Sequence, residues 1–206
     1  QNTEIVKTPK DSQILQSAKT EFQGKTNTEA YIVIVTNSAS VIAKSEKSGE
    51  FKIPIELAAG LNLADIRVFD ANLSQAGTEQ KTLFVKEGEP LPQNWQVYAG
   101  SVKGILDNLI TLTSLTGEKS LKKNDKTNLI LPSPVLSKKS PAPDESIRIG
   151  DFAIALGEVK DAILSAQDLE IIRENKPQIT KKISVSKILT ASKGGKFSAK
   201  DNEAGK

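Results

Sequence analysis

Residues 48–62, SGEFKIPIELAAGLN, contain the clearest strand pattern of the sequence. Apolar side chains alternate here with polar residues and a proline, at Phe51, Ile53, Ile55 and Leu57. An alternation with period two places the apolar side chains on one face of a β-strand. Pro54 cannot donate a backbone hydrogen bond, so we expect this strand at a sheet edge or at a bulge. The pattern predicts a strand with one buried and one wet face.

Other segments of the first 88 residues also have the pattern of short strands. The run Tyr31–Val35, YIVIV, is rich in β-branched residues and too short for a helix. Further strands are predicted at residues 4–7, 20–23, 40–43, 64–69 and 81–86. Short strands at intervals of roughly ten residues predict an antiparallel sandwich.

Residues 89–95 interrupt this pattern and are predicted to be a linker. The surrounding stretch, KEGEPLPQN at 86–94, combines charges, a glycine and two prolines without apolar alternation. Such a composition is typical of a short and fairly stiff connection. We therefore expect one domain at 1–88 and a second at 96–175.

The second domain has fewer and longer strand patterns. Strands are predicted at 96–106, 109–115, 127–131, 152–156 and 169–172, and Asp107-Asn108 joins the first two by a tight turn. Ala153 and Ala155 alternate with large apolar residues, which indicates close approach of another strand. Residues 132–143 hold four of the nine prolines and are predicted to be a protruding loop. Five strands in about 80 residues suit a small Greek-key barrel.

The net charge of +3 is concentrated near the C-terminus. Residues 176–206 carry eight lysines against two acidic residues, a net charge of +6, which leaves −3 for the other 175 residues. The segment SVSKIL at 184–189 repeats the S-V-x-x-I-L pattern of SVKGIL at 101–106. Residues 176–206 are therefore either a basic tail or the start of a truncated second barrel.

The 206-residue chain contains no cysteine and no histidine. These absences exclude cysteine nucleophiles, Ser-His-Asp triads, thiolate or imidazole zinc sites, iron–sulfur clusters and disulfides. Only three of the 28 basic residues are arginine, and a lysine-dominated chain indicates a solvated surface rather than a nucleic-acid interface. We expect no enzymatic activity, no cofactor, no metal and no nucleic-acid partner.

Several motifs of the first 88 residues resemble those of a bacterial immunoglobulin-like surface module. They are TPKD at 8–11, FQGKT at 22–26, AYIVI at 30–34 and the stretch 48–62. The resemblance implies a β-sandwich that acts as a spacer or weak binder. Within it, Gly49 turns a hairpin, Phe51 anchors the core, and Gly60 with Asn62 tolerates unusual turn dihedrals.

Residues 96–173 resemble a bacterial domain of unknown function with an OB-like barrel, often found in exported proteins. The matching segments are GSVKGI at 100–105, ITL at 110–112, IGDFAIALG at 149–157 and LSAQDLEI at 164–171. This resemblance implies a fold and a compartment, and it implies no chemistry.

Trp95, Tyr98 and Phe152 are the candidate ligand-binding residues. An OB-like barrel could stack bases or sugar rings on these aromatic side chains. The alternative for Trp95 is packing at the seam between the two domains.

Acidic residues offer two weaker candidate sites. Glu46, Glu50, Asp65 and Asp70 could contribute oxygen ligands to Ca²⁺, and the alternative is a set of solvated strand faces. Asp151 could be a catalytic carboxylate, and the alternative is a turn residue whose side chain accepts backbone hydrogen bonds.

The chain starts at Gln1, contains no methionine and is rich in serine, threonine and lysine. We expect a processed chain or an excised piece of an exported bacterial protein, located in the cell envelope or outside the cell; a cytosolic fragment is the alternative. The longest apolar block, around 30–35, is too short to span a bilayer, so a membrane anchor would lie outside the given chain.

These observations lead to one functional hypothesis and one alternative. The hypothesis is a non-enzymatic surface or envelope module that acts as a spacer, adhesion or ligand-binding unit. Its partners would be a cell-envelope polymer, a glycan or a protein. The alternative is an oligonucleotide- or saccharide-binding protein that uses the OB-like barrel.

Overall fold

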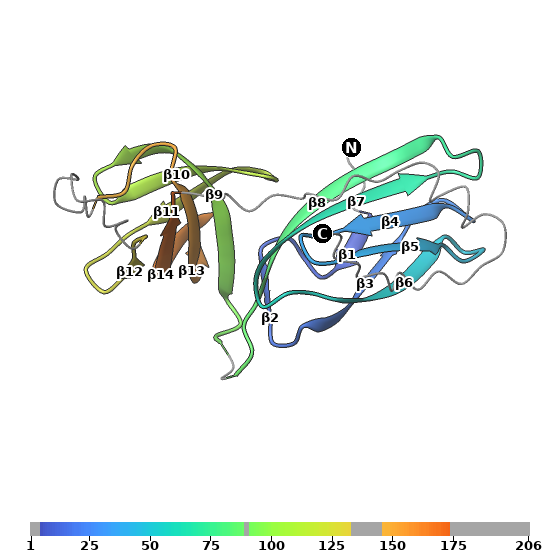
Figure 1. Ribbon diagram of the computed structural model, residues 1–206, viewed down its shortest axis with the longest axis horizontal. Coiled ribbons are helices and arrows are strands. Elements are labelled where there is room, and N and C mark those ends of the chain that lie inside the picture. Colours follow the sequence, from blue (N-terminus) through green and yellow to red (C-terminus); the bar gives the residue numbers. More distant parts are fainter. Residues whose placement is uncertain (1–4, 89–90, 133–145, 174–206) are drawn as a thin grey trace, which may run out of the picture.

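The computed structural model describes residues 5–88, 91–132 and 146–173, and the regular elements in these ranges are all β-strands (Figure 1). The fold class is therefore all-β, as predicted. No helix in these ranges is long and apolar enough to cross a membrane. The predicted basic tail at 176–206, most of the proline-rich loop and part of the linker lie outside the described residues.

The strands form two lobes that follow one another along the long axis of the molecule (Figure 1). The N-terminal lobe is residues 5–88 and the C-terminal lobe is the described part of 91–173. Each lobe has its own apolar cluster, and a further cluster lies between them.

Two sheets face each other in the N-terminal lobe. The three-stranded sheet has the order β1 (Val6–Thr8), β3 (Lys19–Lys25), β6 (Glu50–Glu56). The opposite sheet has the order β8 (Gln75–Val85), β7 (Gly60–Phe69), β4 (Tyr31–Val35), β5 (Ser40–Lys44). Fully buried side chains from both sheets, among them Phe22, Ile34 and Ile66, form the core.

The stretch 48–62 behaves largely as its pattern predicts. Strand β6 is an edge strand and places Pro54 opposite Glu21, which confirms the expected edge position. Phe51 is buried in the core, and Gly49 and Gly60 have φ angles of 81° and 82°. Asn62 acts differently, because it lies within β7 and its side chain bonds both the amide and the carbonyl of Ala58.

The C-terminal lobe is a circuit of paired strands. Its members are β9 (Trp95–Leu106), β10 (Leu109–Ser114), β11 (Gly117–Lys122), β13 (Phe152–Lys160) and β14 (Ile163–Ile172). The pairings run β9-β10-β11-β14-β13 and return to β9, and the β11–β14 pairing is parallel. The predicted strand at 127–131 is β12 (Asn128–Ile130), which pairs with β14. Strand β11 was not predicted, because its charged residues hide the single buried Leu121.

Small residues allow the strands of this lobe to approach closely. Ala153 and Ala155 are fully buried in the lobe interior. A Cβ on Gly100 would lie 2.4 Å from the carbonyl oxygen of Thr113, and a Cβ on Gly157 would lie 2.0 Å from that of Ser165. The close approach that the alternating alanines indicated is therefore present.

A short strand, β2 (Gln13–Leu15), joins the two lobes. It pairs in parallel with β8 and, through Gln13 and Gln96, antiparallel with β9. The large sheets of both lobes thereby form one continuous sheet of 11 strands among the described residues. The assignment of 1–88 and 96–175 as separate domains stays a prediction.

We predict that Gly157→Ala lowers the free energy of unfolding by about 1–3 kcal/mol, because the added methyl group forces the backbone of β13 or β14 to move. Gly104→Ala is the matched control, since nothing lies within 4 Å of its added Cβ. Its effect should stay within about 0.5 kcal/mol. Urea unfolding followed by the fluorescence of Trp95 measures both variants, and equal stabilities would contradict the close approach.

Candidate functional site

An apolar cluster fills the space between the two lobes. We call it the junction cluster; its buried members are Leu61, Leu63, Val97, Ala99, Phe152, Ile154 and Leu156, and Ile14, Phe84, Trp95 and Ile172 pack against them. Alternation along β7, β8 and β9 turns these side chains away from the core of each lobe. The lobes thus share buried apolar surface in addition to backbone hydrogen bonds.

The turn before β2 fastens this junction through the carboxylate of Asp11. Asp11 Oδ1 accepts a hydrogen bond from the amide of Thr82 in the N-terminal lobe, at 2.9 Å. Asp11 Oδ2 accepts one from Thr116 Oγ1 in the C-terminal lobe, also at 2.9 Å, and lies 3.4 Å from Lys119 Nζ. The neighbouring Ser12 bonds Thr82 and Val97 through its backbone. A single turn therefore contacts both lobes.

Tyr98 lies close to this charged turn. Its side chain is buried in the C-terminal lobe, and Lys119 Nζ is 5.2 Å from the centre of its ring. Burial, together with the negative charge of Asp11, raises the pKa of the Tyr98 hydroxyl above its ordinary value. The folded protein therefore favours the neutral phenol.

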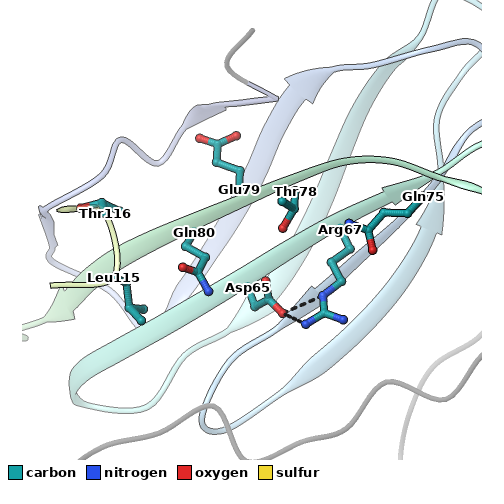
Figure 2. A pocket seen from close by; sticks show the side chains of 8 residues that line it. All are labelled: Asp65, Arg67, Gln75, Thr78, Glu79, Gln80, Leu115 and Thr116. Atoms are coloured by element: carbon teal, nitrogen blue, oxygen red, sulfur yellow. Dashed lines mark hydrogen bonds and ion pairs between the residues drawn. The ribbon is translucent and has the colours of Figure 1, made fainter. Parts of the chain in front are cut away.

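A polar groove of about 530 Å³ lies beside the junction (Figure 2). We call it the junction groove; its lining residues are Asp65, Arg67, Gln75, Thr78, Glu79, Gln80, Leu115 and Thr116. The first six come from β7 and β8, and the last two come from the turn between β10 and β11. Both lobes therefore contribute to its walls.

An ion pair lies within the groove. Arg67 Nη2 is 2.6 Å from Asp65 Oδ2, and Arg67 Nε donates to the same oxygen at 2.9 Å (Figure 2). The side chain of Asp65 is 8 % exposed, whereas that of Arg67 is 43 % exposed. Arg67 neutralises a nearly buried carboxylate while its guanidinium stays open to solvent.

One buried hydroxyl lies on the same face of β8 as the groove residues Thr78 and Gln80. Residues 78, 80 and 82 alternate onto one face of the strand. Thr82 Oγ1 is buried and has no hydrogen-bond partner among the described residues. A buried polar atom of this kind normally bonds to a water molecule or another polar group.

The predicted aromatic residues do not share one surface. Phe152 is a buried member of the junction cluster, and the half-buried Trp95 packs against that cluster. Tyr98 lies in the core of the C-terminal lobe, on the opposite face of β9. Tyr98 and Phe152 are only 5 % and 8 % exposed, so neither presents an open ring face. Their role in ligand binding stays a prediction.

The candidate calcium ligands do not form one cluster among the described residues: the amide of Glu46 donates to the carbonyl of Glu50 at 2.8 Å, and Asp65 and Asp70 have other partners. Asp65 pairs with Arg67, and Asp70 Oδ1 accepts hydrogen bonds from the amides of Asn72 and Ser74. No group of three or more potential metal-binding carboxylates occurs in the part of the chain that the structure describes.

Asp151 has the role of a turn residue. Its Oδ2 accepts a hydrogen bond from the amide of Arg148 at 2.9 Å, which confirms the predicted contact with the backbone. Its Oδ1 also lies 3.2 Å from Arg173 Nε. The carboxylate fixes the turn that leads into β13 and joins it to the end of β14.

Sequence reasoning offered a seam near Trp95 as an alternative, but it missed the Asp11 turn, strand β2 and the groove. The signals for these were the apolar pair Ile14-Leu15 after Asp11-Ser12 and the Thr116-Gly117 turn. The contact between Asp11 and Thr116 joins residues 105 positions apart, which no local pattern reveals.

We predict that Tyr98→Phe reduces the loss of stability at alkaline pH. The pKa of the Tyr98 hydroxyl is higher in the folded protein than in the unfolded chain. The neutral hydroxyl therefore contributes to the free energy of unfolding below about pH 10, and this contribution is lost as the pH rises through the folded-state pKa. Urea unfolding between about pH 8 and pH 12 measures the effect. If the free energy of unfolding fell equally with pH in the wild-type protein and in Tyr98→Phe, the prediction would be wrong.

No family model matches this chain, and no curated protein matches it either.

Proposed function

We propose that the chain is a non-enzymatic spacer and adhesion module of a bacterial cell surface or envelope. In this proposal an immunoglobulin-like sandwich and an OB-like barrel are locked into one rigid rod. The junction is the observation that carries the proposal. A strand paired with both lobes, a shared apolar cluster and Asp11 together oppose movement between the lobes.

The strand order supports the finer description of each lobe. Two facing sheets around one core suit a sandwich. A five-membered circuit of pairings with a long first strand, β9, suits a small closed barrel. These resemblances supply the expected setting, namely modules exported to the bacterial surface.

Rigidity is the property that the junction adds. Domains joined only by a linker move relative to each other unless the interface between them is large and apolar. Here the junction cluster contains seven buried apolar residues, and Val97 donates a backbone hydrogen bond to Ser12 across the lobes at 3.0 Å. A module of this kind keeps a fixed separation between whatever is attached at its two ends.

The alternative, ligand binding on the aromatic residues of the barrel, has less support. Tyr98 and Phe152 are packed in two different clusters, so a base or a sugar ring could reach them only after local opening.

We predict that the two lobes tumble as one body. Backbone ¹⁵N relaxation of the full chain should give the same rotational correlation time for β4 and β7 as for β13 and β14. Clearly shorter and unequal times for the lobes would overturn the rigid-spacer proposal.

A variant isolates the contribution of Asp11. Asp11→Ala leaves the amide of Thr82 without its partner, which costs about 1–3 kcal/mol for a buried donor. We expect amide hydrogen exchange to accelerate at Thr82 and Val97 and to stay unchanged at Ile32. Asp168→Ala is the control, because Asp168 bonds the exposed Asn128 away from the junction. If the amides of Thr82 and Val97 exchanged at the same rate in Asp11→Ala as in Asp168→Ala, Asp11 would not hold the lobes together.

A further inference from the structure

We propose that the junction groove is a binding site for a segment of a neutral, hydroxyl-rich saccharide chain. This rests on the adhesion part of the proposed function and names its ligand class, whereas the spacer part requires no ligand. The argument rests on the unused hydrogen-bonding groups of the groove, its balanced charge, and its two walls from different lobes.

The groove offers polar groups that no other described residue occupies. Gln75, Thr78 and Gln80 are exposed on β8, and the structure shows no hydrogen bond from their side chains to another described residue. Each glutamine amide supplies donors and an acceptor, and the threonine hydroxyl supplies both. Adjacent hydroxyl groups of a sugar ring also act as donors and acceptors, so the two sets are complementary.

The guanidinium of Arg67 adds a fixed donor. The side chain of Asp65 is 8 % exposed, and its Oδ2 accepts both contacts from Arg67, whose side chain is 43 % exposed. The ion pair therefore holds the guanidinium in place beside β7 before any ligand arrives. A preorganised donor lowers the entropic cost of binding a hydroxyl group.

Charge balance selects a neutral ligand. The charged lining residues are Asp65, Arg67 and Glu79. Asp65 is paired with Arg67, and Glu79 lies 3.2 Å from the buried Lys81. Each of them is therefore paired within the protein, which favours a neutral ligand over an ionic polymer.

The size and composition of the groove fit an extended polar segment. A volume of about 530 Å³ lies within the range of about 300–1,000 Å³ that is typical of small-molecule sites. Such sites are mostly apolar, whereas here Leu115 is the single apolar lining residue. Leu115 is 38 % exposed and can contact the C–H face of a sugar ring.

The junction positions the second wall of the groove. Thr116 bonds Asp11, and this contact holds the turn that carries Leu115 against β8. Binding should therefore depend on the docking of the lobes as well as on the groove residues themselves.

Titration of the ¹⁵N-labelled full chain with soluble oligosaccharides tests the proposal. The probes are maltohexaose, cellohexaose and the N-acetylglucosamine hexamer at millimolar concentrations, with an oligogalacturonate of the same length as the anionic comparison. We expect at least one neutral probe to give saturable shifts at the amides of residues 75–80 and 115–116. The anionic probe should bind more weakly.

Two matched variants separate the groove from the rest of the surface. Gln80→Leu removes an amide from the groove and should weaken binding about three- to tenfold. Gln23→Leu changes an exposed strand glutamine of the opposite sheet and should leave the affinity unchanged. Asp11→Ala should weaken binding without altering any groove side chain of β7 or β8.

Three results would overturn the proposal: no saturable shifts with any neutral probe, unchanged affinity in Gln80→Leu, or tighter binding of the anionic probe. None of these results bears on the rigid-spacer proposal, because the rotational correlation times are measured without a ligand.

Discussion

The Asp11 turn and the strand that follows it are the constraint on which the arrangement of the two lobes depends. The ion pair between Asp11 and Lys119 is partly exposed, and such pairs contribute little free energy. The bond to the amide of Thr82 matters more, because that residue is buried. The junction cluster supplies apolar burial, and the directional bonds of Asp11 join one turn to residues of both lobes.

The strands with strong local patterns were predictable from the sequence, whereas the short strand β2 and the charged strand β11 were not. Residues 31–35 and 51–57 bury alternate or continuous apolar side chains, so their periodicity identifies β4 and β6. Strand β2 has three residues and β11 has one fully buried side chain, so neither has a period to detect. Their conformations depend on partners far along the chain, at β8, β9 and β14.

The candidate site was harder to predict than the fold. Trp95 and Tyr98 are three positions apart in one strand, and an odd spacing places two side chains on opposite faces. That rule argues against one stacking surface for both, and the two residues indeed belong to different clusters. The groove residues have an ordinary strand composition. A recess forms on β7 and β8 only because the loop between β10 and β11 docks beside them.

The proposed rigidity of the junction and the proposed ligand site would be linked thermodynamically. A ligand that contacts both walls of the groove binds the docked arrangement better than an undocked one, so binding also stabilises the junction. Conversely, if the lobes are already docked before the ligand arrives, less entropy is lost when the ligand binds. A spacer with such a groove would hold its ligand at a fixed place along the rod, because the residues that bind the ligand and those that set the geometry meet at the Asp11 turn.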